Sequence, residues 1–189
     1  MEYFNQKNYD KAIEYFTLSS DLNNSDAQIM LYSIYNTFQL NGNKALNYFK
    51  LSLDNNNSLA QVSIYLTIIK FIVNKINHIK FEKICNIKIN YETAIKYLEL
   101  SANQNNATAQ SLLGQLYIDN LVIKQDYIKA FEYLEKSAKQ NFKYATQKLV
   151  ILYENGWGVK KDTEKAKQYF ELSLNQSIPN HYSFMDKYK

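Results

Sequence analysis

A five-residue motif, Ala-x-x-Tyr-[Phe/Leu], recurs along the chain and constrains its fold more than any other feature. Successive alanines stand 33, 49, 36 and 36 residues apart, which gives a period of 36 with one insertion of 13 residues. A serine follows each alanine by seven residues, and offsets of 0, 3, 4 and 7 form one stripe of an α-helix. The copies are Ala12-Tyr15-Phe16, Ala45-Tyr48-Phe49, Ala94-Tyr97-Leu98, Ala130-Tyr133-Leu134 and Ala166-Tyr169-Phe170.

Residues that favour helix ends bracket each copy of the motif. Four residues before each alanine stands Asn or Asp, whose side chains accept hydrogen bonds from free amides of a first helical turn. Eleven residues after it stands Asn in four of the five copies, and Asn tolerates the left-handed backbone that ends many helices. The predicted caps are Asn8, Asn41, Asn90, Asp126 and Asp162, and the predicted ends are Asn23, Asn56, Asn105, Asn141 and Ser177.

A second helix is predicted in each repeat, opening on an alanine fifteen residues after the first alanine. Ser25 with Gln28, and Ser58 with Gln61, have the spacing of a capping box at its start. We name these opening helices A and the motif-bearing helices B. The A helices are predicted near 26–38, 59–73, 107–119 and 144–155, and the B helices near 9–22, 42–55, 91–104, 127–140 and 163–176. The fold class is therefore all-α, built from antiparallel helix pairs.

The repeat also predicts the domain organisation. One repeat domain is expected over 1–189, with a partial unit 1–24, full units 25–57, 58–106, 107–142 and 143–178, an insertion at 71–90 and a C-terminal cap at 179–189. In that cap Tyr182, Phe184 and Met185 are expected to plug the last repeat. Each repeat of such an array buries its face on a neighbour, so a second copy could also cover an open end and form a homodimer.

The segment Gly156-Trp157-Gly158 holds two of the four glycines and invites comparison with a phosphate-binding loop. A phosphate loop needs a preceding strand and a Lys-Ser/Thr pair that leads into a helix, and neither is present. The glycines are instead predicted to form a corner between an A and a B helix. Val159 and Trp157 would fill the gap between repeats there.

The composition limits the classes of partner and the cellular compartments that can be expected. The net charge is +4 and is carried by lysine alone, which argues against nucleic acid because Arg supplies the bidentate contacts to bases and phosphates. Cys85 is the one cysteine, which suits a reducing compartment. The first residues lack the basic and apolar regions of a secretory signal, and the apolar run at 63–73 is too short to span a bilayer. We therefore expect a cytoplasmic protein.

Few side chains in the sequence are candidates for catalysis. His78 and Cys85 share the insertion, but nothing supplies a third orienting group or an oxyanion site, and His181 stands alone. No spacing of metal ligands is found. We predict no catalytic residue, no metal, no cofactor and no enzymatic activity.

The repeated positions resemble the Sel1-like repeat, a relative of the tetratricopeptide repeat. The copy that carries the resemblance best reads ATQKLVILYENGWGVKKDTEKAKQYFELS, residues 145–173. The chain departs from the family pattern in three ways. Glycine follows the A-helix leucine only at Gly114, Asn stands where glycine usually separates units, and the Gly-x-Gly-Val corner occurs only once. The resemblance covers nearly the whole chain.

This resemblance implies a right-handed α-solenoid that binds other proteins, as adaptors in quality control, signalling and host–microbe contact do. Some cysteine-rich secreted relatives are associated with β-lactam binding. A chain with one cysteine cannot form their disulfides, so a β-lactam-interacting, hydrolase-like protein is the weakest alternative.

The A helices are expected to line the concave side of the solenoid, and their off-core positions mix polar and apolar residues without a single lysine. This composition favours a protein or peptide partner, and the chain is interpreted as a non-enzymatic scaffold or adaptor. A helical-repeat RNA-binding protein is the alternative, which would need a basic concave face. The predicted groove positions are Asp26, Ile29, Ser33, Asn36, Leu59, Val62, Leu66, Ile69, Thr108, Ser111, Gln115, Ile118, Tyr144, Gln147, Ile151 and Glu154.

The insertion at 71–90 has two interpretations. It is rich in Ile and Phe interleaved with lysine, and it follows the apolar stripe Leu59, Val62, Leu66 and Ile69. The extra chain could fold back as a lid over that stripe, with its isoleucines buried and its lysines in water. It could instead be a basic amphipathic segment that docks on a partner or on an anionic membrane surface.

Overall fold

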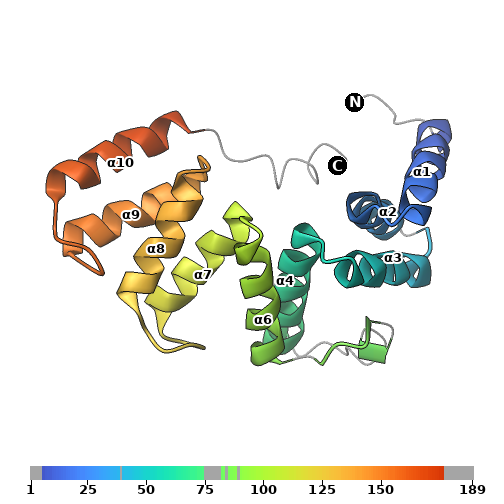
Figure 1. Cartoon of the computed structure of the whole chain (residues 1–189), viewed down its shortest axis with the longest axis horizontal. Helices are drawn as coiled ribbons and strands as arrows, with labels where there is room; N and C mark the ends of the chain where they lie inside the picture. The colour runs from blue at the N-terminus through green and yellow to red at the C-terminus, as the bar shows by residue number, and fades with distance from the viewer. Residues whose placement is uncertain (1–5, 39, 75–81, 84, 89, 177–189) are drawn as a thin grey trace. The chain divides into compact units, whose positions relative to one another are not determined.

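The chain is all-α in the computed structural model, which describes residues 6–38, 40–74, 82–83, 85–88 and 90–176 (Figure 1). Within these residues every regular element is a helix, which confirms the predicted class. The A helices are α2 (Ser25–Thr37), α4 (Ser58–Asn74), α7 (Ala107–Asp119) and α9 (Lys143–Asn155). The B helices are α1 (Gln6–Asp21), α3 (Gly42–Asp54), α6 (Tyr91–Asn103), α8 (Tyr127–Ala138) and α10 (Thr163–Asn175).

The helices fall into two compact units, Met1–Leu100 and Ser101–Lys189. In the first unit α1 packs on α2, α2 on α3 and α3 on α4. In the second, α7 packs on α8, α8 on α9 and α9 on α10, and α7 also contacts α9. Sequential packing of alternating A and B helices is the arrangement expected from the repeat. The organisation of the chain as one domain with the unit boundaries given above stays a prediction.

Asparagine and aspartate set most helix boundaries, as predicted. The side chains of Asn41, Asn90, Asp126 and Asp162 each accept a hydrogen bond from a backbone N–H of the following first turn. The expected cap Asn8 is wrong, because α1 already begins at Gln6 and a cap must precede the helix. The predicted helix ends Asn23, Asn56, Asn105 and Asn141 have φ of 60°, 60°, 61° and 60°, and Ser177 lies outside the described residues.

The predicted capping boxes are wrong. The true caps of α2 and α4 are Asn24, which accepts from Asp26 N and Ala27 N, and Asn57, which accepts from Ala60 N. Gln28 and Gln61 therefore stand one residue too far along the helix to reach back to the cap. Their amides bond instead to Ser20 O and Asn56 Oδ1.

A stacked tyrosine pair joins the two helices of three repeats. The rings of Tyr117 and Tyr133 lie 6.0 Å apart with planes at 9°, and Lys129 Nζ lies 5.5 Å from the Tyr117 ring. Equivalent groups are Tyr35 with Tyr48 and Lys44, and Tyr153 with Tyr169 and Lys165. The repeated tyrosines thus serve packing first. In the α4–α6 repeat the fully buried Ile68 stands where the others have the first tyrosine.

The Gly156–Gly158 corner is confirmed as a structural feature. Gly156 ends α9 in a left-handed conformation with φ of 72°. Gly158 has φ of 69°, and a Cβ added there would lie 2.0 Å from Tyr127 O at the start of α8. Trp157 stacks on the Tyr127 ring with centroids 4.9 Å apart, and Val159 packs against the core that contains Leu149. The corner therefore locks one repeat onto the B helix of the preceding repeat.

Part of the insertion is described. Helix α4 runs on to Asn74, so this A helix is longer than the others, as expected. Cys85 and Ile87 are buried, while Lys83 and Lys88 are exposed, which agrees with apolar residues inside and lysines in water. The side chains whose charges act on Cys85 are Lys50 and Asp54, and both stand on α3. Leu66 of the apolar stripe on α4 is 44% exposed. Ile76, Ile79, Phe81 and Ile84 lie outside the described residues, so the lid over the stripe stays a prediction.

Candidate protein-binding site

The structure corrects the predicted groove at three positions. Ile29, Val62 and Ser111 are only 5%, 6% and 1% exposed, so they belong to the core and cannot contact a partner. All three stand two residues after the opening alanine of an A helix. In the second unit α7 packs on α9 as well as on α8, so that side of an A helix faces a neighbouring A helix.

In the first unit, several predicted groove residues take part in internal contacts. Asp26 Oδ1 accepts a hydrogen bond of 2.7 Å from Asn57 Nδ2, which ties the start of α2 to the start of α4. Ser33 Oγ donates to Ile29 O within its own helix. Asn36 and Leu66 are exposed, and Leu59 and Ile69 are half-buried.

In the second unit, the predicted residues on α7 and α9 form a more continuous surface. Tyr144, Gln147, Ile151 and Glu154 on α9 are exposed, and Thr108, Gln115 and Ile118 on α7 are half-buried. Helices α7 and α9 are in contact, and the hydrogen bond between Tyr144 and Gln115 shows that side chains of this surface meet across the two helices. We call Gln115, Ile118, Tyr144 and Ile151 the α7–α9 surface.

Polar contacts hold the tyrosine of the α7–α9 surface in place. Tyr144 Oη donates a hydrogen bond of 2.9 Å to Gln115 Oε1, which bridges α9 and α7. The Gln115 amide in turn donates to Asp119. Lys148 Nζ lies 5.0 Å from the centroid of the Tyr144 ring, so a lysine borders this surface although none stands at the predicted positions. The surface offers an oriented phenol, an amide and an exposed isoleucine.

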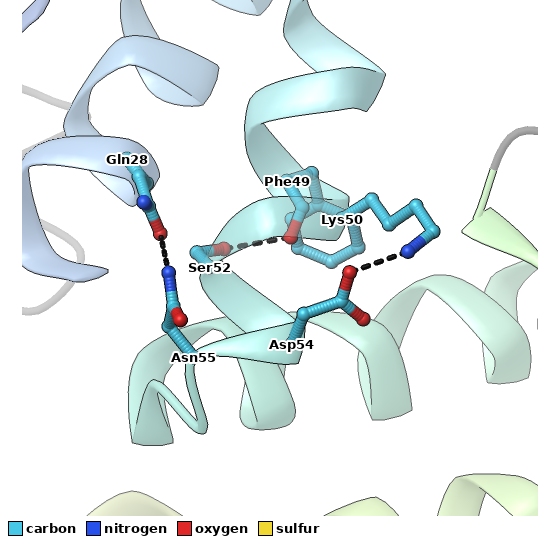
Figure 2. A network of polar contacts seen from close by, with 6 residues as sticks. All are labelled: Gln28, Phe49, Lys50, Ser52, Asp54 and Asn55. Atoms are coloured by element: carbon cyan, nitrogen blue, oxygen red, sulfur yellow. Dashed lines mark hydrogen bonds and ion pairs between the residues drawn. The ribbon is translucent and has the colours of Figure 1, made fainter. Parts of the chain in front are cut away.

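A buried glutamine recurs in the A helices and was not among the residues predicted from the sequence. Gln28 Nε2 donates to Ser20 O at 3.4 Å, and Gln28 Oε1 accepts from Asn55 Nδ2 at 3.0 Å, as Figure 2 shows for the latter bond. Gln110 repeats both contacts, donating to Ala102 O and accepting from Gln140 Nε2 at 2.8 Å. The signal was the dipeptide Ala-Gln at the start of three A helices. The fourth A helix has Thr146 there instead.

An open depression of about 450 Å³ lies beside Gln28 in the first unit. Its lining surface is somewhat more apolar than polar, and the charged side chains in it are Asp21 and Lys44. The lining residues are Ser20, Asp21, Asn23, Gln28, Lys44, Asn47, Tyr48 and Leu51.

The one cysteine is held in its unreactive form. Burial is the main cause that raises the pKa of the Cys85 thiol from its ordinary 9.0 to about 11, while the charge of Lys50 lowers it and that of Asp54 raises it. The thiol therefore stays protonated at neutral pH, whereas a nucleophilic cysteine needs a lowered pKa. His78 and His181 lie outside the described residues. In the part of the chain that is described, no three His, Cys, Asp or Glu residues are grouped to hold a metal ion.

The family of the chain follows from comparison with known repeats. The Sel1 repeat matches residues 6–24, 27–57, 85–106, 107–142 and 142–177. These matches take up most of the sequence, and the chain belongs to the Sel1 repeat family. The gap in the matches between 57 and 85 covers α4 and most of the insertion. No curated protein matches the chain.

Solved structures support the same fold. A Sel1 repeat protein from Oxalobacter formigenes superposes with a TM-score of 0.71 at 21% identity, over 95% of this chain and 49% of that one. The protein c5321, a protective antigen of uropathogenic Escherichia coli strains with an SLR fold, superposes with a TM-score of 0.65 at 18% identity, over 86% of this chain and 32% of that one. The chain thus spans half or less of the length of these proteins. Their likeness establishes a helical-repeat solenoid.

Within the described residues, no helix is both long and apolar enough to cross a membrane.

Proposed function

We propose that this chain is a non-enzymatic scaffold that binds a segment of a partner protein on the α7–α9 surface. Sel1 repeats are in general protein-interaction modules, and the family membership supports that class of function. The adaptor role, the site and the compartment are our proposal. The single buried Cys85 suits a reducing compartment, and we place the scaffold in the cytoplasm.

The observation that carries the site is the hydrogen bond from Tyr144 to Gln115. It fixes Tyr144, which is 41% exposed, on the same face of α9 as Ile151, which is 39% exposed. An oriented tyrosine supplies apolar area at a small cost in conformational entropy and is enriched at binding hot spots. The neighbouring amide of Gln115 can exchange its internal bonds for bonds to a peptide backbone.

The proposal is tested with a displayed peptide library selected on the immobilised full chain. The affinity of each selected peptide is then measured for the wild type and for a variant that combines Gln115→Ala, Tyr144→Ala and Ile151→Ala. We expect a loss of affinity of at least about tenfold, as for the removal of a hot spot. Tyr144 and Ile151 are 41% and 39% exposed and Gln115 is half-buried, so the melting temperature should change much less than for core substitutions.

The matched control carries Glu132→Ala and Glu171→Ala, exposed residues of the B helices α8 and α10. It should keep the affinity of the wild type. Peptides that bind the triple variant and the wild type equally would place the site elsewhere. Binding of random RNA that falls steeply with salt would place the protein in a different class.

A further inference from the structure

Two asparagine–glycine pairs stand at helix boundaries of the chain, Asn41-Gly42 and Asn155-Gly156. In such a pair the backbone nitrogen of the second residue can reach the side-chain carbonyl carbon of the first, because glycine has no Cβ to obstruct the approach. The structure places the two pairs at opposite ends of a helix. Asn41 caps the start of α3, whereas Asn155 is the last residue of α9. The fold therefore gives the same two residue types different surroundings.

At Asn41 the attacking nitrogen is free and the oxygen of the side-chain amide is held. Asn41 Oδ1 accepts hydrogen bonds from Asn43 N at 3.1 Å and from Lys44 N at 3.0 Å. Two such donors stabilise a negative charge that develops on this oxygen, as in an oxyanion hole, and the start of the helix dipole adds to their effect. Among the described residues the Gly42 N–H donates no hydrogen bond, since amides of a first turn have no acceptor within their helix. Both residues are exposed to water.

At Asn155 the matching groups are already bound. Its Nδ2 amide donates a hydrogen bond of 2.8 Å to Ile151 O, and the Gly156 N–H donates to Leu152 O. Both hydrogen bonds must open before the nitrogen can attack the side-chain carbonyl. The pair also lies at the carboxyl end of α9, where the helix dipole disfavours a developing negative charge. The fold therefore protects this second pair.

We propose that Asn41 is a site of spontaneous modification, at which the folded protein loses the side-chain amide, and that Asn155 is not. Hydroxide takes the proton of the Gly42 N–H, and Gly42 N forms a bond to Asn41 Cγ. The bond from Cγ to Nδ2 then breaks, and ammonia leaves with a proton from water, so that a cyclic imide remains. Water opens the imide at either carbonyl. One opening gives aspartate with the original main chain, and the other gives isoaspartate, in which the main chain runs through the former side chain.

The two products differ in their effect on α3. The aspartate product matches the caps of two other B helices, because Asp126 and Asp162 accept the same kind of hydrogen bond at the starts of α8 and α10. It therefore keeps the start of the helix and adds a negative charge there. The isoaspartate product lengthens the main chain by a methylene group, which displaces the cap and loosens the first turn.

The test follows both asparagines in the full chain during incubation in mildly alkaline buffer. Mass spectrometry of proteolytic peptides detects the exchange of an amide for a carboxylate, and chromatography separates aspartate from isoaspartate. Asn41 should react at least about tenfold faster than Asn155, because a single positioned donor to an oxyanion can contribute more than that to a rate. In urea the two rates should become similar, since both pairs then lie in flexible chain.

Gly42→Ala is the matched variant. Nothing lies within 4 Å of the Cβ that it adds, so the fold is kept while the approach of the nitrogen is hindered. This variant should slow the reaction at Asn41 and leave the rate at Asn155 unchanged.

Three outcomes would overturn the proposal. The first is a reaction at Asn155 that is as fast as the reaction at Asn41 in the native protein. The second is the same ratio of the two rates in native buffer and in urea, because the local sequence alone would then set the ratio. The third is a Gly42→Ala variant that loses the Asn41 amide as fast as the wild type. None of these outcomes depends on the α7–α9 surface.

Discussion

Tyr153 on α9 stacks on Tyr169 on α10, with ring centroids 5.5 Å apart and planes at 17°. Lys165, which precedes the motif alanine of α10, lies with its Nζ 5.5 Å from the centroid of the Tyr153 ring. The same group of a lysine and two tyrosines occurs in two other repeats. The group joins the A helix of a repeat to the B helix of the same repeat. Buried alanines on these helices let them approach closely.

Replacing Tyr169 by leucine should lower the free energy of unfolding by about 1 kcal/mol, because the apolar volume is largely kept while the ring stack is lost. Tyr169→Phe keeps the stack and is the control. The measurement is urea unfolding followed by circular dichroism. Equal stability of the leucine and phenylalanine variants would show that the stack adds nothing beyond apolar burial.

The corner glycines should differ sharply in their tolerance of alanine. Gly158→Ala should cost roughly 3 kcal/mol or more, because a left-handed backbone is combined with a Cβ at 2.0 Å from Tyr127 O, a backbone atom that cannot move aside alone. Gly156→Ala meets its nearest atom at 3.2 Å and should cost about 1–2 kcal/mol, mainly through its backbone conformation. Thermal unfolding of the two variants compares them directly, and a smaller loss for Gly158→Ala would contradict this account.

Thr146→Gln should stabilise the last repeat by about 1 kcal/mol, the net contribution of a typical hydrogen bond. Gln140 bonds to Gln110, but the amide of the matching Gln176 is buried without a partner among the described residues. A glutamine at 146 would offer the acceptor that Gln110 offers, at a position where Gln28, Gln61 and Gln110 are already buried. The reverse change, Gln110→Thr, should destabilise by a similar amount. A fall in stability for Thr146→Gln would mean that this site has no room for the longer side chain.

Cys85 should react slowly with thiol reagents in the native protein, and its reaction should quicken as the pH rises toward 11. The folded pKa lies above the ordinary value of 9.0, so the native state keeps a proton that the unfolded chain loses. The stability that this thiol contributes is complete below pH 9 and is lost as the pH rises toward 11. Asp54→Asn should lower the pKa and speed the reaction, because the Asp54 charge is one of its causes. Reaction rates in native buffer and in urea give the comparison, and equal rates at pH 8 would contradict the burial.

Local chemistry explains why helix boundaries could be predicted. A cap such as Asp162 and a left-handed residue such as Asn141 act within one turn of their own position, so spacing in the sequence is enough to find them. Gln28 could not be assigned in this way, because its acceptor role depends on Asn55, 27 residues away. The burial of Ser111 depends on the packing of α9 on α7, which spacing on one helix cannot reveal.

The longest departure from the 36-residue period falls between an A helix and its B helix, the same place as the Gly156–Gly158 corner. Two of these corners are closed by matching backbone bonds, Asp126 N to Tyr117 O and Asp162 N to Tyr153 O. Despite the 13 extra residues, Ala94 and Leu98 of the following B helix remain fully buried. The loop between an A helix and its B helix can therefore change in length while the core residues of the B helix stay buried. A foreign loop grafted between Leu121 and Val122, where Leu121 is already 82% exposed, would be displayed without altering the repeat that carries it.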